Sequence, residues 1–381
     1  MDIEFSEQQS LIQNSARSYL AANFSGQMLR DAHSGSRSDV EKTWQDMADL
    51  GFMGIAVPEN FGGFGGNFAD LLVLLEEMGR VTLPSPFFST VVFAVEILKA
   101  LDNQNINKVI LPAIASGAIR LAVMLGDEGS GFDVTGLSLT AQPDKNGYIL
   151  NGVGQFIPKG HEADYLICAS RIGSSKIPKN DIGVFCIAAD IPGLERKPLN
   201  TINGQYAAKV TFDNVHICED DLVGHSSDVW PALEQAMFKT AVAKCAEMVG
   251  ACARIVEIAV EHAKERRQFG KPIGSFQAIQ HHCADMLTDL DSARWMMYKT
   301  GWLIDEGKAT RSDMAMTKAW CNQACRRILA TGHQVMGGIG YCEEHDMPLF
   351  YRYIRMAEAT MGTSDDHLAI VATDLLSEAL A

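Results

Sequence analysis

The 381-residue sequence predicts an α+β protein in which helices, a β domain and a second set of helices follow one another. Apolar residues recur at helical spacing up to about residue 118, with a period of two from 119 to about 226, and again at helical spacing to the end. No helical segment of useful length interrupts the middle stretch, which favours an antiparallel β domain over alternating strands and helices. We therefore expect three domains, at residues 1–118, 119–226 and 227–381.

The expected elements follow from local patterns. In the first stretch, residues 11–20 and 70–79 have helical periodicity, whereas the glycine-rich residues 54–66 predict a loop. In the second, short β-branched or aromatic runs predict strands at 119–125, 148–150, 165–169, 183–188 and 209–212. In the third, long periodic segments predict helices at 232–267, 275–305, 312–336 and 363–380.

Composition limits the partners and the compartment. The net charge of −15 repels phosphate backbones, and no apolar run reaches the ~20 residues that a membrane span needs. We therefore expect neither nucleic acid nor a membrane as a partner. The first residues form no basic or apolar leader, and the nine cysteines include no C-x-x-C pair, so reduced thiols in a cytoplasmic protein are expected.

Three glycine clusters, at 62–66, 126–131 and 337–340, invite a nucleotide-binding interpretation. None completes G-x-G-x-x-G between a strand and a helix of a βαβ unit, so a Rossmann site is not expected. His281 and His282 point about 100° apart on a helix, and a pair of ligands such as His281 and Asp285 is too few. No metal site is therefore expected.

Four segments, in this order along the chain, resemble the acyl-CoA dehydrogenase family, flavoenzymes that desaturate acyl-CoA thioesters. They are Gly54–Glu59 with Leu75–Gly79, Gly126–Asp133 with Leu150–Ile157, Glu265–Gln277 with Ala284–Met286, and Gln334–Tyr341. The resemblance implies a β-barrel or sandwich in the middle domain and a C-terminal four-helix bundle. It also implies FAD as cofactor, an acyl-CoA substrate, a homo- or heterotetramer, and an electron-transfer flavoprotein or oxygen as electron acceptor.

The resemblance further implies where FAD binds. A guanidinium fork suits the diphosphate, and glycines permit close approach of the cofactor. The residues at the ADP end would be Arg266, Gln268, Phe269 and Gln277. Those that reach the FAD of a neighbouring subunit would be Gln334, Gly337 and Gly338. Those against the flavin ring or beside FAD would be Val123, Leu125, Gly126, Phe156, Pro158, Thr363 and Asp365.

One flavin-facing segment departs from the family pattern. Where most relatives have W-[IF]-[TS], this chain has Phe156-Ile-Pro158. Proline offers neither a hydroxyl nor an N–H, so the flavin edge loses a partner. We expect this to affect redox tuning and docking of the electron acceptor rather than FAD binding.

The family's chemistry needs a carboxylate that accepts the α-proton and donors that stabilise the developing enolate oxygen. In most relatives the carboxylate precedes a G-[TS] pair, where this chain has Met361; in a minority it lies at the position of Thr240. Both residues are expected to face the substrate, and neither side chain can accept the proton. The backbone N–H of Met361 can still serve the thioester oxygen.

Three hypotheses stay open. In the first, Glu247, seven residues after Thr240 on the same helix face, is a relocated catalytic base, with an ion pair to Lys244 as the competing structural interpretation. In the second, the chain is one subunit of a heteromeric dehydrogenase whose partner carries the base, as in bacterial relatives that act on bulky or dicarboxylic acyl-CoAs. In the third, it is a desulfinase-like flavoprotein that removes no α-proton. The acyl chain is not identified.

Overall fold

The computed structural model describes residues 4–33, 38–126, 136–172, 180–204 and 207–380. They form two compact units, each assembled from separate pieces of chain. The first unit comprises Met1–Ser36, Asn67–Pro84 and Ala241–Ala381, and the second comprises Arg37–Gly66 and Ser85–Thr240. The three domain bounds expected from the sequence stay a prediction. The glycine motif that follows Gly126 lies outside the described residues.

Two capped helices form the N-terminal part of the first unit. Helix α1 (Glu7–Asn23) begins after Ser6, whose hydroxyl accepts a hydrogen bond from the backbone N–H of Gln9. Helix α4 (Phe68–Arg80) begins after Asn67, whose side chain accepts from the N–H of Asp70. In both, the third helical residue bonds back to the cap, a reciprocal arrangement that fixes the start of the helix. Helix α2 (Gly26–His33) follows α1, and the helices predicted at 11–20 and 70–79 are confirmed.

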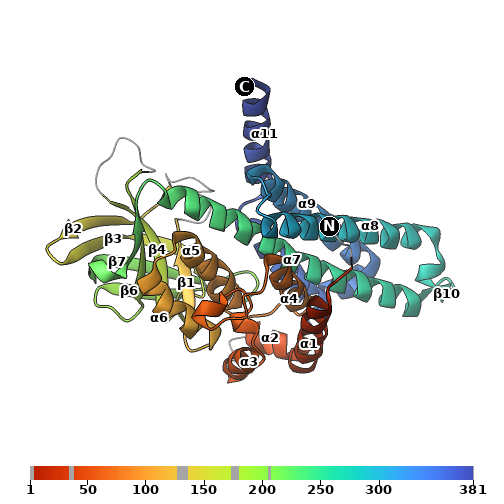
Figure 1. The fold of residues 1–381 in the computed structure, drawn as a ribbon. Coiled ribbons are helices and arrows are strands. Elements are labelled where there is room, and N and C mark those ends of the chain that lie inside the picture. Colours follow the sequence, from red (N-terminus) through yellow and green to blue (C-terminus); the bar gives the residue numbers. More distant parts are fainter. Residues whose placement is uncertain (1–3, 34–37, 127–135, 173–179, 205–206, 381) are drawn as a thin grey trace. The chain divides into compact units, whose positions relative to one another are not determined.

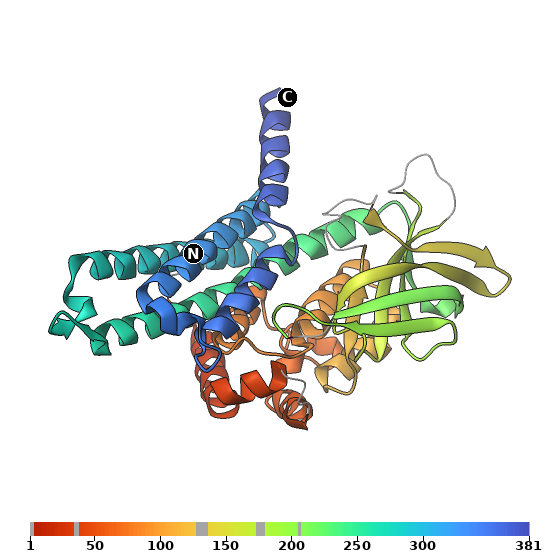
Figure 2. The ribbon, with the colours of Figure 1, turned by 180° about the vertical axis from the view of Figure 1, so that it is seen from behind.

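The C-terminal part of the first unit is a bundle of long helices. Helix α7 (Val229–Glu265) starts in the second unit and continues in the first, followed by α8 (Gln277–Asp305), α9 (Arg311–Met336) and α11 (Ser364–Leu380). All four predicted helices are therefore present. Helix α10 (Met347–Ala359) was not predicted. Helices α8 and α9 lie side by side (Figures 1 and 2), and α11 contacts α9, with a hydrogen bond from the hydroxyl of Ser312 to Asp374 at 2.8 Å.

A short hairpin joins α7 to α8. Strand β9 (Arg267–Gln268) pairs antiparallel with β10 (Lys271–Pro272), and Phe269 and Gly270 form its tip with positive φ angles of 53° and 79°. The hairpin explains why α7 ends at Glu265, two residues before the predicted end.

Helices α4 and α7 cross at almost the closest approach that two backbones permit. A Cβ atom added at Gly79 would lie 2.0 Å from the carbonyl oxygen of Glu247, and one added at Gly250 would lie 1.8 Å from that of Glu76. Any side chain at either glycine would push the helices apart. The crossing therefore fixes the part of α7 that carries Glu247.

The second unit is built around one sheet, with strands in the order β6-β7-β3-β2-β4-β5-β8 and β1 paired to β4. The strands are β1 (Leu121–Met124), β2 (Thr140–Asp144), β3 (Gly147–Pro158), β4 (Tyr165–Ile172), β5 (Ile182–Ala188), β6 (Leu194–Leu199), β7 (Ala207–Cys218) and β8 (Leu222–His225). Pairing is mostly antiparallel, as predicted, but β1 and β2 each pair with β4 in parallel. No hairpin joins either strand to β4, which leaves the parallel direction open to them. Strands β2, β6 and β8 were not predicted.

Helices accompany this sheet within the second unit. They are α3 (Ser38–Asp49), the π-helical segment η3 (Phe88–Ala94), α5 (Val95–Leu101) and α6 (Gln104–Ala115). The hydroxyl of Thr90 in η3 accepts from the backbone N–H of Leu121 at 2.9 Å and donates to its carbonyl at 3.1 Å, which anchors the first residue of β1. Residues 54–66 form the predicted loop, with short 3₁₀ turns at Phe52–Gly54 and Glu59–Phe61. Across the described ranges, no helix is long and apolar enough to cross a lipid bilayer.

Candidate active site

In the second unit, the structure brings the two segments predicted to face the flavin together. One runs from buried Val123 in β1 to half-buried Leu125 and Gly126, and the other is the end of β3, where Phe156 and Pro158 are exposed and Ile157 is buried. A Cβ atom added at Gly154 of β3 would lie 2.4 Å from the side chain of Met124. Strand β3 therefore passes directly over the end of β1.

Strained backbone coincides with the predicted site. Seven described non-glycine residues have positive φ, and Phe156 (54°), Phe269 (53°) and Met361 (59°) are among them. Phe156 also lies in a register irregularity between β3 and β7, and Pro158 follows it at the strand end. A bulky residue in this conformation persists only where its surroundings enforce it, and such strain clusters at functional sites.

Thr240 is the last residue of the second unit and lies within α7. Its side chain is fully buried, and its hydroxyl donates to the carbonyl of Ala236 one turn earlier, at 2.7 Å. The hydroxyl is thus engaged inside the helix. A role for Thr240 toward the substrate stays a prediction.

In the first unit, Met361 lies in the turn between α10 and α11. Both Met361 and Gly362 have positive φ, 59° and 92°. The turn is held through its carbonyl groups: His367 Nε2 donates to the Met361 oxygen at 2.7 Å, and Asn322 Nδ2 lies 3.4 Å from the Gly362 oxygen. The backbone N–H of Met361 donates to no group among the residues that the structure describes. It is therefore a free donor in a rigid turn.

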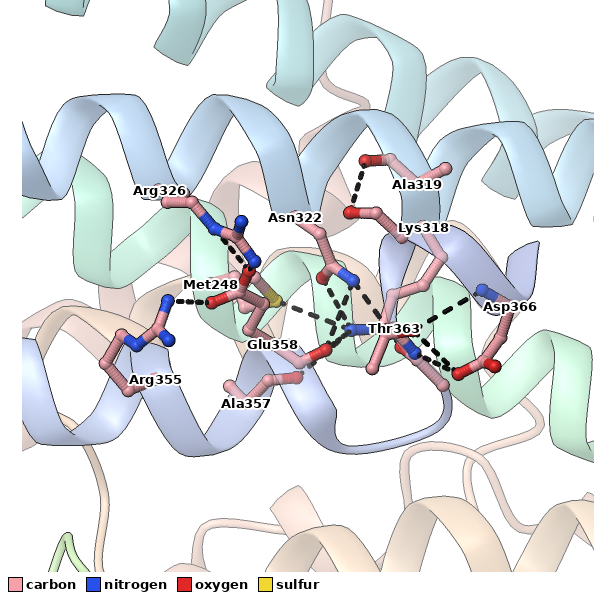
Figure 3. A network of polar contacts seen from close by, with 12 residues as sticks. Met248, Lys318, Ala319, Asn322, Arg326, Arg355, Ala357, Glu358, Thr363 and Asp366 are labelled. Carbon is pink, nitrogen blue, oxygen red and sulfur yellow. Dashed lines mark hydrogen bonds and ion pairs between the residues drawn. The ribbon is translucent and has the colours of Figure 1, made fainter. Parts of the chain in front are cut away.

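A buried lysine stabilises the same turn from α9 (Figure 3). Lys318 is fully buried, and its ammonium donates to the side chain of Asn322 at 2.7 Å and to the carbonyls of Ala357 and Glu358 at 3.0 and 3.3 Å. These carbonyls belong to the last turn of α10, where no helical N–H remains to bond them. Burial lowers the pKa of Lys318 to about 8. Lys318 therefore acts as a side-chain cap for α10.

Side-chain hydrogen bonds of Asn322, Thr363 and Asp366 also hold the turn between α10 and α11. Asn322 Nδ2 also donates to the Glu358 carbonyl at 3.1 Å. On the other side of the turn, the N–H and hydroxyl of Thr363 donate to Asp366 at 2.9 and 2.8 Å, which starts α11 (Figure 3). Thr363 and Asp365 are both exposed and follow Met361 by two and four residues in the chain.

Glu247 is buried on α7 and already has two partners. Its Oε2 atom pairs with the ammonium of Lys244 and accepts a hydrogen bond from the hydroxyl of Tyr353 in α10 at 2.8 Å. Burial and the nearby Glu247 carboxylate raise the pKa of Tyr353 well above its ordinary value, so the phenol remains a donor. The ion pair that competed with a catalytic role in the sequence is present. The hydrogen bond from Tyr353 to Glu247 joins α10 to α7.

The residues predicted for the ADP end of FAD, and those predicted to reach the FAD of a neighbouring subunit, are all exposed and belong to the first unit. They are Arg266, Gln268, Phe269, Gln277, Gln334, Gly337 and Gly338. A Cβ added at Gly332 of α9 would meet the side chains of Ile255 in α7 and Met286 in α8, so these three helices approach one another near the predicted residues. Phe269 is 91% exposed, and no atom lies within 4 Å of a Cβ built on Gly337 or Gly338. The two glycines leave an open surface that a ligand can approach closely.

Sequence reasoning missed Lys318, Asn322 and His367. A signal was present, because residues 314, 315, 318, 322 and 325 fall on one buried face of the helix predicted at 312–336, and a lysine interrupts that face. A charged residue on an apolar stripe needs internal partners, and here it finds carbonyl groups.

Comparison with known proteins agrees with this arrangement. Family models for the acyl-CoA dehydrogenase N-terminal, middle and C-terminal domains match residues 6–118, 122–215 and 230–376. The chain is 28% identical over 340 residues to the probable acyl-CoA dehydrogenase YngJ of Bacillus subtilis, covering 88% of this chain and 90% of that protein. It is 27% identical over 380 residues to the caffeyl-CoA reductase-Etf complex subunit CarC of Acetobacterium woodii, covering 98% and 100%.

A solved structure supports the fold. A variant of the steroid ACAD Tcur3481-Tcur3483 superposes with a TM-score of 0.86 at 27% identity, over 98% of this chain and 99% of that one. The α+β architecture with N-terminal helices, a central sheet and a C-terminal bundle is thereby confirmed. The chain belongs to the acyl-CoA dehydrogenase family, FAD-dependent oxidoreductases that act on the CH–CH bond of acyl-CoA thioesters.

Proposed function

We propose that this chain is one subunit of a heteromeric acyl-CoA dehydrogenase, in which it holds the thioester oxygen while a second, different chain supplies the base. The observation that carries the proposal is the turn at Met361. Its backbone N–H is unpaired within the described part of the chain, and its direction is fixed by His367 and Asn322. A fixed, unpaired N–H is the donor that a developing enolate oxygen requires.

The proton acceptor is what this chain lacks. Met361 and Thr240 occupy the two positions at which relatives carry a carboxylate, and neither is an acid. Glu247 is an acid, but its Oε2 atom is shared by an ammonium and a phenol. A base must reach the substrate, and this carboxylate is held between α7 and α10, so turning it would break both the ion pair and the hydrogen bond. These contacts favour a structural role for Glu247, and a base on another chain is the simplest remaining source.

The residues of the predicted cofactor site fit FAD. The open surface at Gly337 and Gly338 admits a bound group without a clash, and Arg266 and Gln268 provide exposed donors of the kind that a diphosphate needs. When bound, FAD accepts the hydride that leaves the β carbon. The chain's own part is to position the cofactor and the thioester. Phe156, in its strained bend, and Pro158, which lacks an N–H, would shape the flavin edge.

The similar proteins support the proposal that this chain works in a complex with other chains. CarC is a subunit of a caffeyl-CoA reductase-Etf complex, and the steroid ACAD structure carries the names of two chains. We infer an oligomer with an electron-transfer flavoprotein as the electron acceptor. An acyl-CoA is the expected substrate.

The test is anaerobic reduction of bound FAD by acyl-CoA. The isolated, FAD-loaded chain is expected to show little bleaching of the flavin absorbance, and the chain purified with the product of a neighbouring gene is expected to show full bleaching. Full bleaching by the isolated chain would refute the proposal that a second chain supplies the base. Glu247→Gln in that isolated chain then tests whether Glu247 is the base. Bleaching by neither preparation, with both fully loaded, would favour the desulfinase-like chemistry instead.

A further inference from the structure

A cavity of about 330 Å³ opens on the first unit, and none of its lining residues is one assigned above to FAD or the thioester. It lies among α1, the segment before it, α4 and α8. Its lining residues are Phe5, Gln13, Arg17, Glu76, Arg294, Trp295 and Tyr298. The volume falls at the lower end of the range for small-molecule sites.

Hydrogen bonds to the buried carboxylates of Glu76 and Glu77 hold the two arginines of the cavity in place. Glu76 is buried, and its two oxygens accept from Arg294 Nε at 2.9 Å and from the Tyr298 hydroxyl at 2.8 Å. Arg17 donates through Nε and Nη2 to buried Glu77 at 2.9 and 2.6 Å. Burial and Glu76 raise the pKa of Tyr298 well above its ordinary value, so the phenol remains protonated. Both guanidinium groups are therefore oriented before any ligand arrives.

These groups retain donors that the protein does not use. Nη1 of Arg17 and Nη2 of Arg294 donate to no residue in the described ranges, and the same holds for the side-chain amide of Gln13. The buried carboxylates neutralise much of the positive charge, but fixed N–H groups still favour an anion that can accept two hydrogen bonds, such as a carboxylate or phosphate.

The remaining walls are aromatic. Phe5 packs edge-to-face on Tyr298, with ring centroids 5.4 Å apart, and Trp295 is 44% exposed. Exposed rings of this kind provide a stacking surface for a flat apolar group. Donors on one side and rings on the other recognise a molecule that has both features.

We propose that this cavity binds a small organic anion that carries an aromatic ring, with the anion on Arg17 and Arg294 and the ring against Trp295. A nucleoside monophosphate and an aryl carboxylate share this chemistry. The site is independent of the proposed dehydrogenase function, since none of its residues belongs to that machinery.

Calorimetric titration of the FAD-loaded protein tests the site. The probes are adenosine monophosphate, benzoate, adenosine and inorganic phosphate. Binding of either aromatic anion at least about tenfold more tightly than adenosine and phosphate supports the proposal. The anion that binds more tightly shows whether the ligand is a nucleoside monophosphate or an aryl carboxylate. Failure of both aromatic anions to bind better than phosphate overturns it.

Two variants locate the binding. Trp295→Ala removes an exposed ring, and Arg17→Gln removes a guanidinium while Glu77 keeps Arg80 nearby, at 3.7 Å. Each substitution is expected to lower the affinity for the aromatic anion about tenfold and to leave flavin reduction unchanged. Leu287→Ala, another exposed apolar residue of α8 outside the cavity, is the matched control and should bind as the parent does. Equal affinity in all three variants would show that the anion binds elsewhere and would overturn the proposal.

Discussion

Replacing Met361 by glutamate restores a carboxylate at the position where most relatives carry it. The surrounding turn should accept the change, because its contacts run through backbone carbonyls rather than through the Met361 side chain. Glutamate is about as long as methionine and, like it, unbranched at Cβ and Cγ, so the positive φ of 59° strains both residues alike. The substitution therefore adds a proton acceptor without a new steric demand.

The expected gain follows from the chemistry of a positioned base. General base catalysis contributes about 10²- to 10⁴-fold, which corresponds to roughly 3–5 kcal/mol of barrier. The isolated Met361→Glu chain, loaded with FAD and mixed anaerobically with acyl-CoA, should bleach its flavin faster than the parent chain by that factor. The rate is measured by stopped-flow absorbance.

Met361→Gln is the matched control, because glutamine has the size and shape of glutamate but is neutral and cannot accept the proton. It should bleach no faster than the parent. If Met361→Glu binds FAD and acyl-CoA and yet reacts no faster than the glutamine variant, the turn at 361 does not face the α-carbon. The assignment of this turn to the thioester would then be wrong.

Four further outcomes are expected. Glu247→Gln should lower the unfolding temperature, since breaking a buried pair costs about 3 kcal/mol, while flavin reduction by the two-chain enzyme stays within about twofold; lost reduction would assign the base to Glu247. Lys318 has a folded pKa of about 8, below its ordinary 10.5, so the unfolded chain holds the proton more tightly and stability rises with pH between these values by about 3 kcal/mol. Lys318→Met should remove that part of the pH dependence in denaturant unfolding, and an unchanged slope would contradict the burial argument. Gly250→Ala should destabilise by about 3 kcal/mol or more, because its Cβ would lie 1.8 Å from a carbonyl oxygen, and a melting curve like the parent's would refute the tight crossing. Gly338→Ala should melt normally, since nothing lies within 4 Å, but bind FAD more weakly in equilibrium dialysis; equal affinity would remove Gly338 from the cofactor site.

Parts of the fold were predictable because they depend on local sequence. The long helices α7, α8, α9 and α11 each repeat apolar residues over many turns, and the structure places them within three residues of the predicted ends. Strand β6, with the sequence Leu-Glu-Arg-Lys-Pro-Leu, has no apolar alternation, because it is an edge strand that lies half in solvent. Its pairing with β7 supplies what its own residues do not indicate.

The sequence by itself determined which side chains occupy the two usual base positions, since the identity of Met361 and Thr240 needs no coordinates. Only the tertiary structure decided which partners the charged residues Glu247 and Lys318 have. Glu247 meets Tyr353 across 106 residues of chain, and Lys318 meets the end of α10 across about 40. Contacts of this kind depend on how helices pack, and a single residue's periodicity shows only that it is buried, not which group it finds there.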